Sequence, residues 1–291
     1  MRTKLFSVLL ILIITVTSFA QVRVVTSINI IEDWLKIIGQ DKVTIHTLIT
    51  GLETPHTYSP RPSDAVALKK ADAFIGIGLG LESWLEPLRK SAAKKDLPVF
   101  YLANNLELLE TEDEHDHGED NHDHGANPHV WLSLTNAKLM VVELSEILSS
   151  IDPANKSFYQ KNSQNYLAEL NKLKNIYLPK FAALKDKNLV SFPASYPYLF
   201  HELGLIELAR GEETHGQEPS AKHMVYLTNL MKKNNIKVLV VEKQFSTVLP
   251  LTLAKSTGAK PVYLSPLIID NLSYLQLMES NYLNLLAGFK Q

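Results

Sequence analysis

The sequence predicts an α/β protein of two lobes, each with a mainly parallel four-stranded sheet flanked by helices, joined by one long helix. Two observations predict this fold. Short apolar runs alternate with amphipathic helical segments in both halves of the 291-residue chain, as in parallel βαβ units. Between the halves, apolar residues recur at spacings near 3.6 from Phe158 to Tyr177. This spacing predicts a helix of about 25 residues, about 38 Å long.

The leading half contains four expected strands separated by helical segments. Ile30–Ile38 has helical spacing and stops at Gly39, and Ser63 is expected to cap a helix through Lys70. Residues 81–95 have an amphipathic pattern that predicts a further helix. The expected strands are Val22–Thr26, Val43–Ile49, Ala73–Ile77 and Pro98–Leu102.

A helical pair and a second alternating half follow. Ser133–Ser150 is predicted to be a helix; Asp152 is the expected N-cap of the long helix, with Pro153 at its first position and no break until Pro179. The expected strands of the trailing half are Leu189–Phe192, Leu205–Ala209, Lys237–Val241 and Pro261–Leu264. Its expected helices are Tyr198–Leu203, Ser220–Lys233, Val248–Ser256 and Ser273–Gly288.

The first twenty residues have the pattern of a signal peptide. Arg2 and Lys4 precede an apolar run from Leu5, and small residues surround a cleavage point after Ala20. The run is short for a membrane span, which needs about 20 residues, although an uncleaved anchor is the alternative. We therefore expect export to the periplasm. The expected organisation is signal peptide 1–20, N-terminal lobe 21–150 with a loop at 110–127, linking helix 151–185 and C-terminal lobe 186–291.

Composition excludes several classes of function. The formal net charge is −2, which provides no electrostatic footprint for nucleic acid. The chain contains no cysteine, so disulfides, thiolate metal sites and thiol nucleophiles are excluded. The motifs of zinc proteases and of serine hydrolases are missing as well. Any metal site must therefore use nitrogen and oxygen ligands.

Two histidines in loops are the strongest candidates for metal ligands. His56 follows the second expected strand and His129 precedes the helix near residue 133, each beside a proline that restricts the backbone. Neutral imidazole is the commonest ligand of borderline transition metals. Either histidine alone could serve as an ordinary hydrogen-bonding residue. Together they favour a metal site, with Glu53 as a candidate outer carboxylate.

Between the two histidines, an acidic segment carries four more: His115, His117, His122 and His124. Alternating imidazoles and carboxylates suit weak capture of a divalent cation, because ordering such a loop around one tight site costs entropy. The alternative is a merely solubilising loop. A second weak signal is the Gly-rich run from Gly76 to Gly80, which lacks the full dinucleotide fingerprint and is expected to be a turn near the cleft. The three tryptophans, Trp34, Trp84 and Trp131, are expected to be packing residues.

Several motifs, in order along the chain, resemble the periplasmic zinc/manganese-binding proteins of ABC importers, the ZnuA/TroA-like family. The motifs are Pro55-His56-Thr57-Tyr58, Arg61-Pro62-Ser63-Asp64, Gly78-Leu79-Gly80-Leu81-Glu82, Asn127-Pro128-His129-Val130-Trp131-Leu132, Glu218-Pro219-Ser220-Ala221-Lys222 and Glu242-Lys243-Gln244-Phe245-Ser246. The resemblance implies two α/β lobes bridged by a long rigid helix, with one metal ion in the cleft. It also implies that His56 and His129 are the two ligands from the N-terminal lobe.

The same resemblance exposes a departure in the C-terminal lobe. The third family ligand would fall at Phe192 or Pro193 and the fourth at Ser265, and neither position holds a usual donor. Since tight zinc sites usually have three or four protein donors, a substitute is expected. His215, beside Gly216, is the first candidate and Glu242 the second. His201 and His223 lie on predicted helices and are expected to be surface or packing residues.

The resemblance implies an exported solute-binding protein, not an enzyme, that delivers a divalent metal ion to a membrane permease. Imidazole donors favour Zn²⁺ over Mn²⁺, which prefers oxygen. Binding requires neutral imidazoles, so affinity is expected to fall as pH drops through about 6.5. We expect a monomer without a nucleic-acid partner. The alternatives are a zinc-dependent periplasmic hydrolase with an open coordination position, and a metal-free adhesin or interaction protein.

Overall fold

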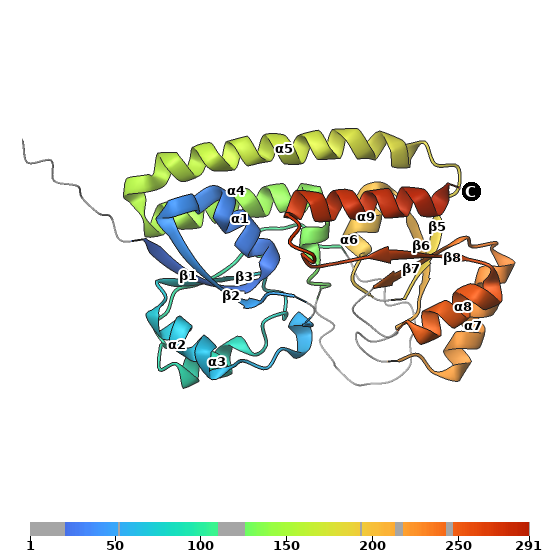
Figure 1. Cartoon of the computed structure of the whole chain (residues 1–291), viewed down its shortest axis with the longest axis horizontal. Coiled ribbons are helices and arrows are strands. Elements are labelled where there is room, and N and C mark those ends of the chain that lie inside the picture. The colour runs from blue at the N-terminus through green and yellow to red at the C-terminus, as the bar shows by residue number, and fades with distance from the viewer. Residues whose placement is uncertain are drawn as a thin grey trace, which may run out of the picture.

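The computed structural model describes residues 21–51, 53–109, 126–192, 194–212, 218–242 and 247–290. These residues form two lobes, each with a four-stranded parallel sheet, which confirms the predicted fold class (Figure 1). The N-terminal sheet has the order β2-β1-β3-β4 and the C-terminal sheet the order β6-β5-β7-β8. The strands are β1 Val22–Ile28, β2 Val43–Ile49, β3 Ala73–Gly76, β4 Val99–Tyr101, β5 Asn188–Ser191, β6 Ile206–Arg210, β7 Val238–Glu242 and β8 Lys260–Leu264.

Both sheets have the same topology, in which the first strand lies inside and the chain crosses over it to the third. Ligands of such open parallel sheets bind beyond the carboxyl ends of the strands, where the strand order reverses. In the N-terminal lobe, the segment that carries His56 leaves the carboxyl end of β2. The fold therefore places one of the two candidate histidines where a ligand of this topology is expected.

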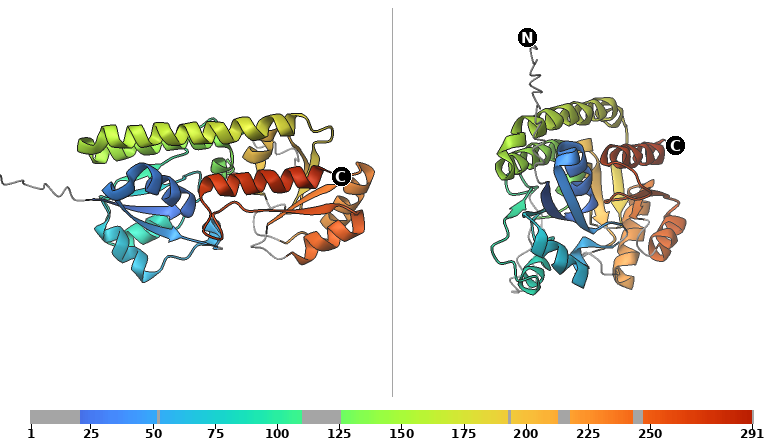
Figure 2. Two further views of the ribbon diagram at one scale, coloured as in Figure 1. Left: turned by 45° about the horizontal axis from the view of Figure 1, so that its top comes forward. Right: turned by 60° about the vertical axis from the view of Figure 1, so that its left-hand side comes forward.

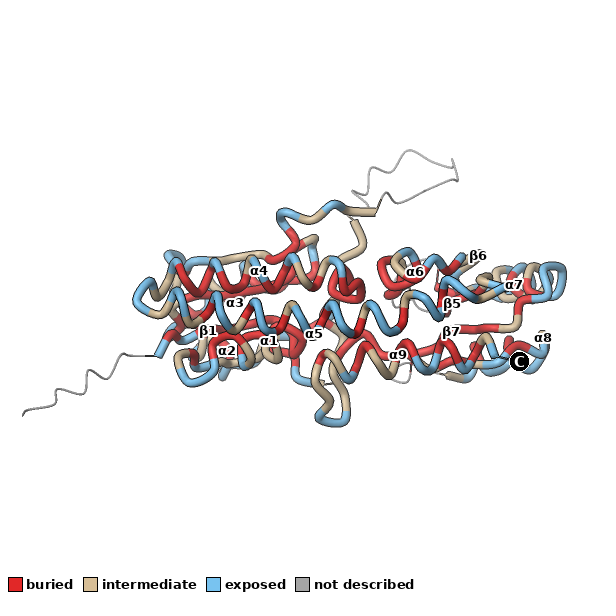
Figure 3. Tube along the Cα trace, turned by 90° about the horizontal axis from the view of Figure 1, so that it is seen from above, coloured by how far each residue is buried: buried red, intermediate tan, exposed pale blue. Residues whose placement is uncertain are grey.

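The helices cover the sheets and connect the lobes. They are α1 Asn29–Gly39, α2 Pro62–Lys70, α3 Leu85–Ser91, α4 Leu134–Ile151, α5 Lys156–Ala182, α6 Pro197–Leu203, α7 Ala221–Lys233, α8 Val248–Thr257 and α9 Tyr274–Phe289. The 27-residue helix α5 lies along both lobes, and α1, α4 and α9 pack beneath it (Figures 1 and 2). Seen from above, one side of α5 is exposed and its other side is buried against these helices (Figure 3).

One hydrophobic core runs through both lobes. It contains β1 and α1 of the N-terminal lobe together with β8 and α9 of the C-terminal lobe, and the buried face of α5 belongs to it. A smaller cluster between β5, β7, α7 and α8 completes the C-terminal lobe. Burial of apolar surface is the main favourable term in folding, so the shared core holds the two lobes in one arrangement.

Polar contacts also join the lobes at several places. The Asn29 side chain donates to the Ile268 carbonyl at 2.8 Å and accepts from the Ile268 N–H at 3.1 Å. The Trp131 indole N–H donates to the Pro266 carbonyl at 2.7 Å, and the Tyr274 hydroxyl donates to the Trp131 carbonyl at 2.6 Å. These contacts satisfy buried polar groups at the interface, which would otherwise oppose its formation.

Another contact between the lobes caps α4. The carboxylate of Glu202 on α6 accepts from the N–H groups of Leu134 and Thr135 at 2.7 and 2.9 Å. Lys174 of α5 lies 3.1 Å from the same carboxylate. A carboxylate at a helix N-terminus satisfies free N–H donors and interacts favourably with the helix dipole. The C-terminal lobe thus fixes the start of the helix that follows His129.

Most element boundaries agree with the sequence, but four predictions were wrong. Asp152 and Pro153, expected to begin the long helix, instead begin a short 3₁₀ turn, Pro153–Asn155, and α5 starts at Lys156 with Asn155 as its N-cap. The helix expected over residues 81–95 covers only Leu85–Ser91. Helix α2 is capped at Arg61, with Pro62 in its first turn, and not at Ser63. Helix α5 continues past Pro179 to Ala182 because the buried side chain of Phe181 keeps its last turn packed against the core.

Two of the expected helices, Ser220–Lys233 and Ser273–Gly288, begin at serines that the structure shows to be N-caps. Ser220 accepts from the His223 N–H at the start of α7, and Ser273 forms a capping box with Gln276 at the start of α9. Within the residues that the structure describes, no helix combines the length and apolar character needed to cross a membrane. The expected signal peptide, residues 1–20, lies outside the described residues.

Candidate metal centre

His56 lies on a short 3₁₀ turn, Pro55–Thr57, that follows β2. Proline suits the first position of such a turn because it lacks an N–H that would need an acceptor. The Trp84 indole N–H donates to the Pro55 carbonyl at 3.0 Å, so the residue before His56 is fixed to the residue that begins α3. The imidazole of His56 is therefore presented by a backbone that is held in place.

His129 is almost fully buried, and its partner is Asn127. The Asn127 Oδ1 atom accepts from the His129 backbone N–H at 3.0 Å, which is the arrangement of an Asx turn. It also lies 2.9 Å from the His129 Nδ1 atom. At its other end, the Asn127 side-chain N–H donates to the Ala194 carbonyl of the C-terminal lobe at 2.7 Å. Asn127 thus orients His129 and joins it to the opposite lobe.

These partners assign the tautomer of His129. The Oδ1 atom can only accept, so the His129 Nδ1 atom must carry the proton that it donates to Asn127. In the neutral imidazole, Nε2 is then the atom with the free lone pair. A hydrogen bond to one ring nitrogen is the usual device by which proteins present the other nitrogen to a metal.

The two imidazoles converge. The His56 Nε2 atom lies 3.4 Å from the His129 Nε2 atom, with ring centroids 5.2 Å apart. Zinc–imidazole bonds are about 2.0–2.1 Å, so two nitrogens on a tetrahedral zinc lie about 3.3–3.4 Å apart. The separation in the structure matches this spacing. In the absence of an ion, a proton on the His56 Nε2 atom can bridge to the lone pair of His129.

Among the residues that the structure describes, no group of three or more His, Cys, Asp or Glu side chains is placed to hold a metal ion. Glu242, the second candidate donor, is buried at the end of β7 and faces the Tyr196 hydroxyl. Burial and the charge of this carboxylate raise the pKa of Tyr196. The structure therefore does not bring Glu242 together with the histidine pair.

The two family ligand positions in the C-terminal lobe have packing and turn roles instead. Phe192 belongs to the smaller hydrophobic cluster and packs so closely on Gly211 that a Cβ there would lie 2.5 Å from its ring. The Ser265 hydroxyl donates to the Leu267 carbonyl at 2.7 Å, and Asn281 bonds to both backbone groups of Ser265. The side chains of Phe192 and Ser265 thus contribute to the local packing and to a turn. Pro193 lies outside the described residues.

Several other candidates lie outside the described residues or have separate partners. His215 and the cluster His115, His117, His122 and His124 are among the residues that the structure does not describe. Glu53 pairs with the guanidinium of Arg61. His201 is exposed on α6, and the His223 Nε2 atom donates to the Arg210 carbonyl at 2.7 Å.

The Gly-rich turn after β3 binds a carboxylate of the chain itself. The N–H groups of Ile77 and Gly78 donate to the Glu82 carboxylate at 2.8 and 2.9 Å. Glu82 is buried, and burial raises its pKa although the two N–H donors favour the charged form. Successive N–H groups of such a turn form an anion-binding concavity. Here Glu82 occupies it, which explains why the glycines are present without a nucleotide fingerprint.

Sequence reasoning named Asn127 within a motif but did not recognise its role. The available signal was its type and position, because Asn two residues before a histidine can form an Asx turn onto that histidine. Trp34, Trp84 and Trp131 are buried, which confirms that they are packing residues.

Comparison with known proteins places this chain in a family. The family model described as "Zinc-uptake complex component A periplasmic" matches residues 24–288. The high-affinity zinc uptake system protein ZnuA of Bacillus subtilis is 31% identical over 272 residues, covering 90% of this chain and 85% of that protein. The zinc-binding lipoprotein AdcA of Streptococcus pneumoniae R6 is 30% identical over 251 residues, and the chain spans about half of its length, 50%.

A solved structure agrees with these sequence matches. The crystal structure of a ZnuA superimposes with a TM-score of 0.81 at 30% identity, and the match covers 93% of this chain and all of that one, 100%. The arrangement of two parallel sheets under a long helix is therefore shared with a protein of that type. The family model, the relatives and the fold agree, and the chain belongs to the family of periplasmic zinc-uptake component A proteins.

Proposed function

We propose that this chain captures a Zn²⁺ ion between its lobes and delivers it to the permease of an ABC importer. The observation that carries the proposal is the 3.4 Å separation of the His56 and His129 Nε2 atoms, with Asn127 directing the His129 lone pair toward His56. Zinc-binding relatives with this fold support the identity of the ion. In this proposal the chain binds and releases the ion and catalyses no reaction.

We propose zinc over manganese because both converging donors are imidazole nitrogens. Two imidazoles leave a tetrahedral ion with two open positions, which water or further donors fill. His215 is the proposed third donor, and Glu242 is a weaker candidate because its carboxylate faces Tyr196. A metal screen with Zn²⁺, Mn²⁺ and Ni²⁺ in competition tests the order of preference.

We further propose that the acidic histidine segment, with His115, His117, His122 and His124, collects ions weakly near the site. The proposed location is the periplasm, reached by cleavage after Ala20, and the proposed state is a monomer with no nucleic-acid partner. Chromatography with light scattering on residues 21–291 measures the oligomeric state, and N-terminal sequencing of the exported protein identifies the cleavage site.

Equilibrium dialysis with metal analysis tests the proposed capture of zinc. We expect the chain of residues 21–291 to bind one tight Zn²⁺, and a variant lacking residues 110–125 to retain this tight equivalent. The additional, weaker equivalents should disappear with the deleted segment, because ordering a polar segment around an ion costs conformational entropy. Absence of binding tighter than about micromolar, a free energy of about 8 kcal/mol, would contradict the proposal and favour an interaction protein.

The role of Asn127 gives a second prediction. Asn127→Ala removes the acceptor that assigns the His129 tautomer, and we expect the zinc affinity to fall about 10- to 100-fold, as for other partners of metal-binding histidines. Asn127→Asp keeps an oxygen acceptor for His129 but loses the N–H that donates to the Ala194 carbonyl. Its zinc affinity should therefore fall less than that of Asn127→Ala. Competition titration with a zinc chelator measures the affinities, and ¹⁵N NMR of the imidazole reports the tautomer.

Asn29→Ala is the matched control. Asn29 is also an amide that bridges the lobes, but it bonds to the Ile268 backbone. We expect it to lower stability while leaving the zinc affinity within about twofold. Equal losses of affinity in the Asn29 and Asn127 variants would show that lobe contact, and not the tautomer of His129, determines binding.

A further inference from the structure

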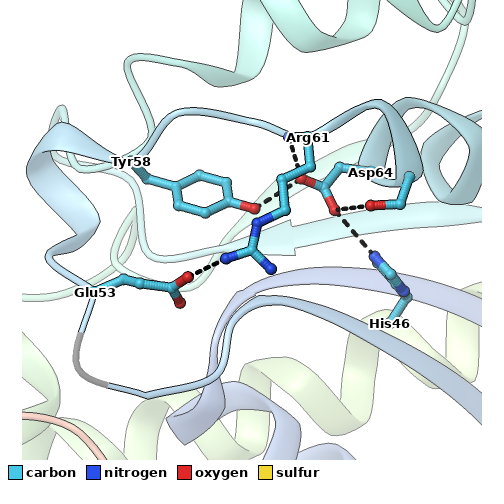
Figure 4. A network of polar contacts seen from close by, with 6 residues as sticks. His46, Glu53, Tyr58, Arg61 and Asp64 are labelled. Carbon is cyan, nitrogen blue, oxygen red and sulfur yellow. Dashed lines mark hydrogen bonds and ion pairs between the residues drawn. The ribbon is translucent and has the colours of Figure 1, made fainter.

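The turn that carries His56 is tied down by one buried carboxylate, Asp64, in the first turn of α2. Asp64 is 4% exposed. Its Oδ2 atom accepts from the Tyr58 hydroxyl at 2.7 Å and from the Arg61 backbone N–H at 2.6 Å. Its Oδ1 atom lies 3.4 Å from the Nε2 atom of His46 on β2 (Figure 4). One side chain therefore joins the strand before the turn, the segment after it and the next helix.

Tyr58 links the contacts of Asp64 to His56, which lies two residues earlier in the chain. Its ring packs edge-on against Trp84, with centroids 5.2 Å apart and planes at 71°. The same tryptophan holds the Pro55 carbonyl through its indole N–H at 3.0 Å. The residue before His56 and the residue two after it are thus both fixed, and His56 lies between these points.

An ion pair also joins the two ends of the segment that carries His56. The Arg61 guanidinium pairs with the Glu53 carboxylate across the turn, as Figure 4 shows. Arg61 also provides the backbone N–H that Asp64 accepts, so the two anchors share one residue. Surface ion pairs contribute little by themselves, and Glu53 and Arg61 are both partly exposed. The buried carboxylate is therefore the stronger of the two anchors.

The charge state of Asp64 agrees with this role. Burial opposes ionisation, but the hydrogen bonds from the Arg61 N–H, the Tyr58 hydroxyl and His46 outweigh it, and the pKa of Asp64 lies below its ordinary value. The ionised carboxylate can only accept hydrogen bonds, and hydrogen bonds to a charged acceptor are about twice as strong as neutral ones. These donors, and the Ser63 hydroxyl at 3.5 Å from the Oδ1 atom, therefore have an acceptor suited to all of them.

We propose that Asp64 is a positioning residue that holds the His56 turn in its metal-binding conformation before an ion arrives. The ion then meets two imidazoles already facing each other and does not have to order the loop, which would reduce affinity. The effect on zinc rests on the proposed function, whereas the ordering of the turn does not. Asp64 thus acts on the ion only through Tyr58, Arg61 and the turn between the anchors.

Tyr58→Phe and Asp64→Asn test the assignment, with Tyr159→Phe as the matched control. The Tyr159 hydroxyl donates to the Asp152 Oδ2 atom at 2.7 Å, the same donor, acceptor and distance as in the Tyr58–Asp64 pair, but at the junction of α4 and α5. We expect the zinc dissociation constant to rise about fivefold in Tyr58→Phe and more than about tenfold in Asp64→Asn. Tyr159→Phe should leave it within about twofold.

Hydrogen exchange in the metal-free protein provides a readout that does not depend on zinc. Exchange of the amides of residues 53–61, and of Arg61 above all, should be faster in Tyr58→Phe and Asp64→Asn and unchanged in Tyr159→Phe. Affinity and exchange equal to the wild type in both test variants would overturn the assignment and leave the proposed function intact. If the wild type binds no zinc, the proposed function fails and the exchange rates alone decide the role of Asp64.

Discussion

Replacing either His56 or His129 with alanine is expected to lower zinc affinity by more than about 100-fold, a larger loss than that caused by removing an outer partner of a ligand. The reason is geometric. The two Nε2 atoms lie 3.4 Å apart, which is the spacing of two donors on one ion. One imidazole alone cannot hold the ion in a chelate. Isothermal titration with chelator competition measures the change.

The double variant provides a sharper test than either single variant. If the two histidines act as one chelating unit, removing both should weaken binding little more than removing one, because coupled residues are not additive. His201→Ala is the control, since that histidine is exposed on α6. Tight stoichiometric zinc in the double variant would show that the ion binds elsewhere, for example in the acidic histidine segment.

Replacing Trp131 with alanine is expected to lower the free energy of unfolding by about 3–5 kcal/mol, the range found when buried tryptophans are truncated. Trp131 is fully buried, donates to the Pro266 carbonyl at 2.7 Å and packs against His129 with ring centroids 5.1 Å apart. The substitution removes packing from the core shared by the lobes and the support of the His129 ring. Zinc affinity should therefore fall together with stability.

Trp131→Phe separates packing from hydrogen bonding. Phenylalanine keeps an aromatic ring but leaves the Pro266 carbonyl without its donor, so we expect a loss of about 1–3 kcal/mol. Val248→Ala is the control because Val248 is 69% exposed. Urea unfolding of the metal-free protein measures each midpoint. A midpoint for Trp131→Ala equal to that of the wild type would show that the contact between the lobes contributes little to stability.

Most strands and the starts of two helices in the C-terminal lobe were predicted correctly from the sequence. The strands were found from short apolar runs, and the starts of α7 and α9 from Ser220 and Ser273, because a cap and an amphipathic face are encoded within a few residues. The predicted length of α3 was wrong because the helical pattern does not reveal a side-chain contact close by in the sequence. Glu82 turns back to the N–H groups after β3, so the residues before Leu85 form a turn although their pattern is helical.

At the site, features encoded by neighbouring residues could be predicted, whereas contacts between distant segments could not. The proline–histidine pairs directed attention to His56 and His129, and the structure brings these residues together. The contacts of Asn127 with Ala194 and of Trp131 with Pro266 could not be predicted, because they cross between the lobes and join residues that are far apart in the sequence. The donor from the C-terminal lobe stays a prediction, since Phe192 and Ser265 have packing and turn roles and His215 lies outside the described residues.

The core that is common to both lobes has a consequence for dividing the protein. A fragment that ended before α5 would leave the apolar faces of α1 and α4 without their cover, and a fragment that began at β5 would lose the partner of α9. Neither piece would contain a complete hydrophobic interior of its own. We therefore expect the protein to fold and unfold as one unit. Chimeras with relatives should stay folded when they exchange surface loops but not when they exchange whole halves.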